Sequence, residues 1–142
     1  LKDGTKKMSK SDLSDLSRIN LTDNNDMIVN KIKKAKTDPK LMPTGEENLK
    51  ERPEAENLLG IYSSLSNQNL EQSKKEFSGK NFSEFKEKLS SLLVEKISPV
   101  SKEIKKLLSD QKYLDNILLE GSQKADKIAS RKIKEMKKMI GF

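Results

Sequence analysis

Two lysines near the start of the chain enclose a Met-Ser pair, in the stretch KMSKSD at residues 7–12. When an acid attacks the α-phosphorus of ATP, negative charge builds on the departing pyrophosphate. Ammonium groups on flexible stems can stabilise this charge as it develops, and serine hydroxyls with backbone N–H groups can complete a phosphate site. Lys7 and Lys10 are therefore the candidate catalytic residues. The candidate ATP-binding residues are Lys7, Met8, Ser9, Lys10 and Ser11.

The stretch by itself also permits a simpler interpretation. Five such residues can occur together by chance in a chain rich in lysine and serine, and they would then form a solvated turn. In the ATP-loop interpretation, Gly4 lets the loop move and close, and Met8 packs it against the rest of the domain.

Composition limits the chemistry that the 142 residues can perform. The chain contains neither cysteine nor histidine, which excludes disulfides, thiolate nucleophiles, imidazole bases and zinc sites with nitrogen or sulfur ligands. We therefore expect no metal site. No apolar run approaches the length of about 18 residues that could span a membrane. The chain begins with Leu1 and shows no signal-peptide pattern, so we interpret it as a piece of a longer protein.

The net charge of +7 is unevenly distributed. Residues 1–40 contain ten basic and six acidic side chains, residues 41–121 twelve and fourteen, and residues 122–142 seven and two. Two basic ends suggest two contacts with an anionic partner. The totals alone fit an ordinary lysine-rich surface better.

The periodicity predicts an all-α protein. Residues 1–22 are expected to form a loop. A helix over 26–37 follows, capped by Asp23 or Asn24 and ended by Asp38-Pro39. Its lysines, from Lys31 to Lys36, are expected to complement the helix dipole rather than to contact RNA.

Five more helices are predicted beyond a polar connection at 38–52. The second helix starts at Pro53. The third runs from Asn69 to Phe77, and the fourth follows a stripe from Phe82 to Leu108 that continues through Pro99. The aromatic residues Tyr62, Phe77, Phe82 and Phe85 are expected in the core. Asp110 caps the next helix, and Gly121 is expected to mark a break or a close contact before the last one, which ends at Gly141.

The last helix has a basic side. Its cations recur at intervals of three and four, and small Ala125 and Ala129 on the other side are expected to allow close helix packing. Such a ridge suits phosphate contacts with RNA, but an exposed amphipathic helix would look the same. The candidate RNA-binding residues are Lys124, Lys127, Arg131 and Lys134.

Several blocks besides KMSKS resemble one family. They are KIKKAKTDP (31–39), RPEAENLLGIYSSLS (52–66), EFSGKNFSEFK (76–86) and LEGSQKADKIASRKIKEMKKMIGF (119–142). Over essentially its whole length, the chain resembles the C-terminal part of the bacterial-type tryptophanyl-tRNA synthetases, which are class I aminoacyl-tRNA synthetases.

This resemblance implies a function. Residues 1–22 would be the end of a Rossmann-type catalytic domain with its KMSKS loop, and 23–142 a helical anticodon-binding domain. The intact enzyme would join L-tryptophan to ATP, accompanied by Mg²⁺, and pass the aminoacyl group to tRNA(Trp) in the cytoplasm. The family's other signature requires histidine, which this chain lacks. The resemblance also implies that the tryptophan pocket and the main homodimer interface lie outside this chain. We therefore expect the chain to bind no cofactor and to be inactive alone.

Two alternatives come from other classes. One is a free-standing basic helical module that binds RNA by charge, which would have no need of an intact KMSKS loop. The other is a membrane-surface protein that uses the helix at 122–140, but this helix lacks the aromatic residues that anchor in the membrane interface.

Overall fold

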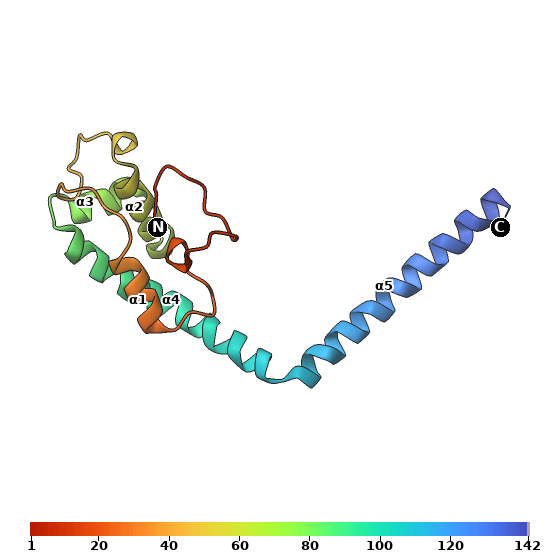
Figure 1. The fold of residues 1–142 in the computed structure, drawn as a ribbon. Coiled ribbons are helices and arrows are strands. Elements are labelled where there is room, and N and C mark those ends of the chain that lie inside the picture. Colours follow the sequence, from red (N-terminus) through yellow and green to blue (C-terminus); the bar gives the residue numbers. More distant parts are fainter. Residues whose placement is uncertain (142) are drawn as a thin grey trace. The chain divides into compact units, whose positions relative to one another are not determined.

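The computed structural model describes residues 1–141, and the regular secondary structure of these residues is helical without a strand, as predicted. The chain divides into two compact units, Leu1–Lys102 and Glu103–Phe142. Figure 1 shows the order of the elements along the chain. They are the short 3-10 helices η1 (Asp15–Ser17) and η2 (Leu49–Glu51) and the α-helices α1 (Asn25–Lys33), α2 (Pro53–Ser66), α3 (Leu70–Phe77), α4 (Phe82–Ser109) and α5 (Gln111–Ile140).

The helix starts follow local chemistry. The Asn24 side chain accepts the N–H of Met27 at 2.8 Å, so the predicted cap of α1 is confirmed. Pro53 is the first residue of α2, where its missing N–H costs nothing. Asn69 caps α3 through a reciprocal capping box with Gln72.

The predicted end of α1 is wrong by one turn, because the helix ends at Lys33 rather than near Thr37. The Lys36 N–H donates to the Leu1 carbonyl at 3.0 Å instead of continuing the helix. The Lys86 ammonium, from α4, donates to the Lys33 and Ala35 carbonyls at 3.0 and 2.6 Å. Contacts from distant parts of the sequence therefore decide where this helix stops.

The hydrophobic core of the first unit lies between α1, α2, α3 and the first half of α4. Three of the four aromatic residues predicted for the core form its centre, whereas Phe82 is partly buried and packs against it. The Tyr62 and Phe77 rings, and the Phe77 and Phe85 rings, meet edge to face with centroids 4.8 Å apart. The buried hydrophobic residues that surround these rings are Ile28, Ile32, Ala35, Met42, Leu49, Leu58, Leu59, Leu89 and Leu93.

Two methionines differ from expectation. Met42, in the connection read as polar, is only 1% exposed. Its N–H donates to the Lys80 carbonyl at 2.8 Å and its carbonyl accepts from the Gly79 N–H at 3.1 Å, and this pairing holds the connection against the end of α3. Met27 is 41% exposed, although it directly precedes the fully buried Ile28 in α1 and its side chain is apolar.

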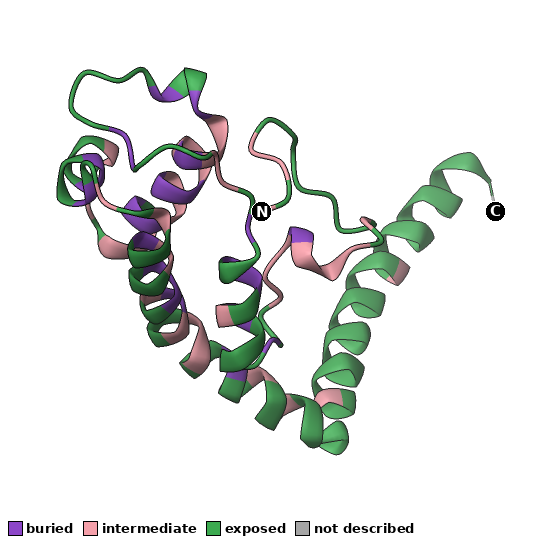
Figure 2. Ribbon diagram, turned by 60° about the vertical axis from the view of Figure 1, so that its left-hand side comes forward, coloured by how far each residue is buried: buried purple, intermediate pink, exposed green. Residues whose placement is uncertain are grey.

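The second unit contains no comparable core. Asp110 caps α5 through the Tyr113 N–H at 3.0 Å, and Gly141 ends it in the left-handed conformation, as predicted. None of the residues of α5 is buried, and Figure 2 shows the helix exposed along its length. The packing expected at Ala125 and Ala129 is therefore not found in residues 1–141.

The break expected at Gly121 is wrong. The α5 helix continues through this residue, and a Cβ added there would meet no atom within 4 Å. Gly121 therefore marks neither a helix end nor a close contact in the described part of the chain.

Candidate functional site

The KMSKS residues form an exposed turn. The Ser9 and Ser11 hydroxyl oxygens lie 3.0 Å apart, the Ser11 N–H donates to Ser9 Oγ at 3.3 Å, and the Asp12 N–H donates to the Ser9 carbonyl at 3.4 Å. Both lysines of the signature are exposed, and within residues 1–141 neither forms an ion pair. The turn therefore presents ammonium groups that can approach a phosphate.

The structure brings only some of the candidate residues to one cavity. Lys7, Met8 and Ser9 line a hollow of about 320 Å³, together with Lys2 and Lys6, whereas Lys10 and Ser11 do not. A carboxylate, Asp3, lies in the same wall. It accepts the Thr5 hydroxyl at 2.6 Å, and this hydrogen bond, with that of the Thr5 N–H, lowers the pKa of Asp3.

Gly4 permits a close approach between the loop and the start of α2. A Cβ at this position would lie 2.4 Å from the Pro53 carbonyl oxygen and 2.8 Å from the Glu54 nitrogen. Both atoms belong to the backbone and cannot swing aside. Glycine is therefore a steric requirement here, in addition to the flexibility that its position suggested.

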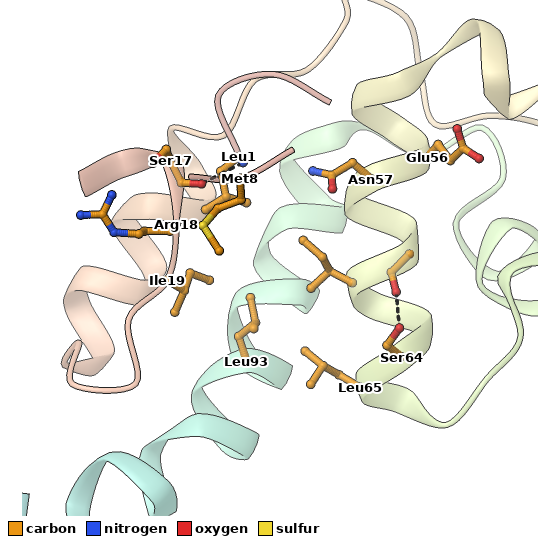
Figure 3. Close-up of a pocket in the computed structure, with 12 residues that line it drawn as sticks. Leu1, Met8, Ser17, Arg18, Ile19, Glu56, Asn57, Ser64, Leu65 and Leu93 are labelled. Atoms are coloured by element: carbon orange, nitrogen blue, oxygen red, sulfur yellow. Dashed lines mark hydrogen bonds between the residues drawn. The ribbon is translucent and has the colours of Figure 1, made fainter. Parts of the chain in front are cut away.

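A larger apolar groove of about 720 Å³ lies beside the loop (Figure 3). The loop contributes Leu1, Met8 and Ile19, α2 contributes Leu65, and α4 contributes Leu93. Met8 thus forms part of an apolar wall, as expected, although it remains 55% exposed.

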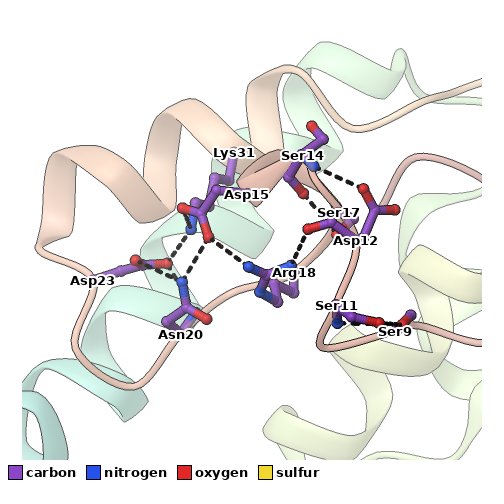
Figure 4. A network of polar contacts seen from close by, with 10 residues as sticks. All are labelled: Ser9, Ser11, Asp12, Ser14, Asp15, Ser17, Arg18, Asn20, Asp23 and Lys31. Atoms are coloured by element: carbon purple, nitrogen blue, oxygen red, sulfur yellow. Dashed lines mark hydrogen bonds and ion pairs between the residues drawn. The ribbon is translucent and has the colours of Figure 1, made fainter.

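The segment after the turn is held by Lys31, which is buried. Lys31 was expected to complement the end of α1, but it is only 3% exposed, and its ammonium lies 2.6 Å from a carboxylate oxygen of Asp15 and 2.6 Å from one of Asp23. Figure 4 shows the three groups converging. Lys31 follows Ile28 by three residues and precedes Ala35 by four, so it stands within the apolar stripe. That position was the available sign of burial.

These contacts continue to the KMSKS signature. Asp15 also accepts the Asn20 side-chain amide at 2.8 Å and pairs with Arg18 at 3.5 Å. Arg18 donates to the main-chain carbonyl of Asp12 at 3.1 Å (Figure 4). Polar contacts therefore connect α1 to the residue that directly follows Ser11.

The charges of this cluster stabilise one another. The hydrogen bond from Lys31, followed by that from Asn20, lowers the pKa of Asp15. Burial acts to lower the pKa of Lys31, but hydrogen bonds to Asp15 and Asp23 outweigh it, so the pKa is raised. Both groups are charged at neutral pH.

The basic candidates on α5 are all exposed, and they differ in their partners. Lys124 lies 4.0 Å from Glu120 and Arg131 lies 3.8 Å from Glu135, both one turn away on the same helix. Such long, exposed pairs contribute little. Lys127 and Lys134 form no ion pair within residues 1–141.

Two further features are absent from residues 1–141. No helix in that part of the chain has the length and apolarity to cross a membrane. Over the same residues, no group of three acidic side chains is placed to hold a metal ion.

Comparison with known proteins identifies the family. The profile of the class I tRNA synthetases for tryptophan and tyrosine, described as "tRNA synthetases class I (W and Y)", matches residues 1–98. The full chain is 49% identical to the tryptophan–tRNA ligase of Rhizobium meliloti and 53% identical to that of Agrobacterium fabrum, and it spans 40% of the length of each. The tryptophan–tRNA ligase of Rickettsia conorii is 46% identical over the same 142 residues, which are 42% of its length.

The two matches differ in extent. The family profile stops before the end of α4, whereas the relatives align with the whole chain, including α5. Both matches confirm the predicted resemblance. The chain belongs to the class I tRNA synthetases of the tryptophan and tyrosine family.

Proposed function

We propose that this chain is the part of a tryptophan–tRNA ligase that carries the KMSKS loop and the helical anticodon-binding domain. The intact enzyme activates L-tryptophan with ATP, releases pyrophosphate and transfers the aminoacyl group to tRNA(Trp). The observation that carries the proposal is the exposed turn of Lys7 and Lys10, in a chain whose whole length aligns with tryptophan–tRNA ligases.

In this proposal the loop stabilises the leaving pyrophosphate. Lys7 and Lys10 supply ammonium groups on flexible stems, and Ser9 and Ser11 supply hydroxyls and a backbone N–H. Charge contacts of this kind lower the barrier only if they strengthen in the transition state. Mg²⁺ would accompany the ATP and neutralise phosphate charge, as phosphoryl-transfer chemistry generally needs.

The division of labour follows the sequence. Residues 1–22 are the end of the catalytic domain, and residues 23–142 are the anticodon-binding domain. Lys124, Lys127, Arg131 and Lys134 contact phosphates of the anticodon arm. The tryptophan pocket and a homodimer interface lie in other parts of the enzyme, which acts in the cytoplasm, so the 142 residues alone are inactive.

The test is tryptophan-dependent pyrophosphate exchange in a full-length ligase that contains this chain. Lys10→Ala should lower kcat by about 10²–10³-fold, the loss typical for one charge-stabilising group, while tryptophan binding changes little. Equal losses in kcat and in tryptophan binding would instead assign Lys10 a structural role. Any exchange by the 142-residue chain alone would contradict the assignment of the tryptophan pocket to other parts of the enzyme.

The second candidate function is RNA binding by charge without catalysis. The observation that favours it is the full exposure of the basic helix α5. Full-length protein that binds RNA but shows no tryptophan-dependent exchange would support this alternative.

A further inference from the structure

The two halves of the KMSKS segment are held very differently. The turn from Lys7 to Ser11 makes hydrogen bonds only to itself and to Asp12 within the described residues. From Asp12 onward the chain is tied to α1 through Arg18, Asp15 and Lys31. The turn therefore has a free tip and a fixed exit.

We propose that Lys31 and Asp15 are positioning residues of the ATP step, which fix the exit of the KMSKS loop so that its lysines reach the leaving pyrophosphate. This inference rests on the proposed function. It concerns residues outside the signature: Lys31 lies 20 positions after Ser11 and touches neither of the loop lysines in the described structure.

Burial explains why the attachment is firm. An ammonium group that is 3% exposed is costly to hold without partners, and two carboxylates at 2.6 Å offset that cost. Asp23 is itself buried, with 2% of its side chain exposed, and lies beside the start of α1. Asp15, whose side chain is 46% exposed, is the partner that belongs to the loop segment itself, at the start of η1. Lys31 thus joins the buried Asp23 to the exposed carboxylate of Asp15, in the segment that follows the KMSKS turn.

The attachment matters for catalysis because it limits where the loop lysines can lie. A group that acts on developing charge must arrive within a fraction of an ångström of its place, and a misplacement of about 1 Å can cost about 10²-fold in rate. A long exposed turn with both ends loose would spread its lysines over many positions. With the exit fixed at Asp12, only the short segment before it has to move.

The decisive variant is Asp15→Asn in the full-length ligase, because it removes the loop-segment charge that pairs with Lys31 and keeps the shape of the side chain. We expect kcat for tryptophan-dependent pyrophosphate exchange to fall by about 10- to 100-fold, with the KM for tryptophan unchanged. Asp15→Glu should recover most of the rate, since the carboxylate can still reach Lys31. A loss smaller than about twofold in Asp15→Asn would overturn the inference.

Glu54→Gln is the matched control. Glu54 also pairs with a lysine, Lys36 at 2.8 Å, and this hydrogen bond lowers its pKa as Lys31 lowers that of Asp15. Among the described residues, the carboxylate of Glu54 pairs with Lys36 and forms no ion pair with the segment from Asp12 to Arg18. The control should lose stability to a similar degree and keep its kcat. If both variants lose the same activity in proportion to their melting temperatures, the role of Asp15 is only structural.

A second substitution tests the connection itself. The double variant with Lys31→Met and Asp15→Asn should lose about as much kcat as the more impaired single variant, because both substitutions break the same ion pair. A loss equal to the product of the two single losses would contradict the proposed connection. If Lys31→Met does not fold, the comparison of Asp15→Asn, Asp15→Glu and Glu54→Gln still decides. A wild-type protein without tryptophan-dependent exchange would refute the proposed function itself, whereas an active wild type with unaffected variants would refute only this inference.

Discussion

Both compact units contain amphipathic helices, but only the first unit buries their apolar sides. In Leu1–Lys102, apolar stripes of four helices meet around three aromatic rings. In Glu103–Phe142, α5 has a stripe of similar spacing, yet Ile128, Ile133 and Met136 are each more than half exposed. An amphipathic pattern thus specifies which side of a helix can be buried, while burial itself requires a partner.

The difference predicts where mutations act. Stability should reside almost entirely in the first unit, whereas the second should respond to changes in helix propensity and surface charge. The chain offers a convenient reporter, since it has only two tyrosines, Tyr62 in the core and Tyr113 on α5. Substituting either one leaves a signal specific to the other unit.

The largest expected effect is on the free energy of unfolding of the first unit. Phe85→Ala should lower it by about 3–5 kcal/mol, because it leaves a cavity at the aromatic centre. Ile128→Ala on α5 should change it by less than about 0.5 kcal/mol. Urea unfolding followed through Tyr62 measures both. A large effect of Ile128→Ala would show that α5 packs on a partner in solution.

Acid should also act on the first unit. Hydrogen bonds from Lys31 and Arg52 lower the pKa of Asp15 and of Glu47, and at Asp38 those from Arg52 outweigh the opposing effect of burial. At a pH between the lowered pKa of the folded protein and the ordinary pKa of the unfolded chain, the unfolded chain binds more protons than the folded protein. The stabilisation is therefore complete above about pH 5 and is lost as the pH falls below about 4.

The measurement is the urea midpoint of the Tyr62 signal from pH 7 to pH 3. Asp38→Asn should flatten the acid limb of this curve, because the Arg52 guanidinium then loses the carboxylate that lies 2.8 Å away. An unchanged curve in this variant would mean that other groups control the acid response.

A smaller effect is expected on RNA affinity, and it should come from the second unit. Lys127→Ala combined with Lys134→Ala should flatten the slope of log K against log salt by about 1.4–1.8, if each lysine contacts one phosphate of the anticodon arm. These two are preferred to Lys124 and Arg131, which lie near glutamates.

The matched control replaces Lys88 and Lys102, which are exposed on the part of α4 within the first unit. Lys86 would be a poor control, because its ammonium holds the end of α1. Equal loss of slope in both double variants would mean that binding follows overall charge rather than the ridge on α5.

The smallest expected effect is a change in stability on replacing a glycine by alanine, and its sign should differ between Gly121 and Gly4. Gly121→Ala should stabilise α5 by about 0.5–1 kcal/mol, because alanine is the better helix former and the added methyl group meets no atom. Gly4→Ala should have the opposite sign and destabilise the first unit, since its Cβ would overlap the Pro53 carbonyl. Thermal unfolding followed by circular dichroism and by Tyr62 distinguishes the two. A destabilising Gly121→Ala would indicate a contact at that glycine in solution.

Local features of the molecule were accessible from the sequence. Asn24, Pro53, Asn69 and Asp110 start helices where predicted, because a cap or a fixed φ angle acts within a few residues. The aromatic centre was also predictable, since its members recur at helical spacing. The KMSKS turn could be recognised as a candidate site because its residues are contiguous in the sequence.

Other features depend on residues far apart in the chain. In the sequence Lys31 is one of several neighbouring lysines, and only the folded structure brings Asp15 and Asp23 to it. Met42 lies in a polar connection, and its burial requires the backbone pairing with Lys80 and Gly79. The end of α1 is set by Leu1 and Lys86. The sequence by itself determined the helices, their caps and the loop signature, because these arise from neighbouring residues. Only the tertiary structure decided which charges are buried and where the loop is anchored, because burial and ion pairing are properties of segments that meet in space.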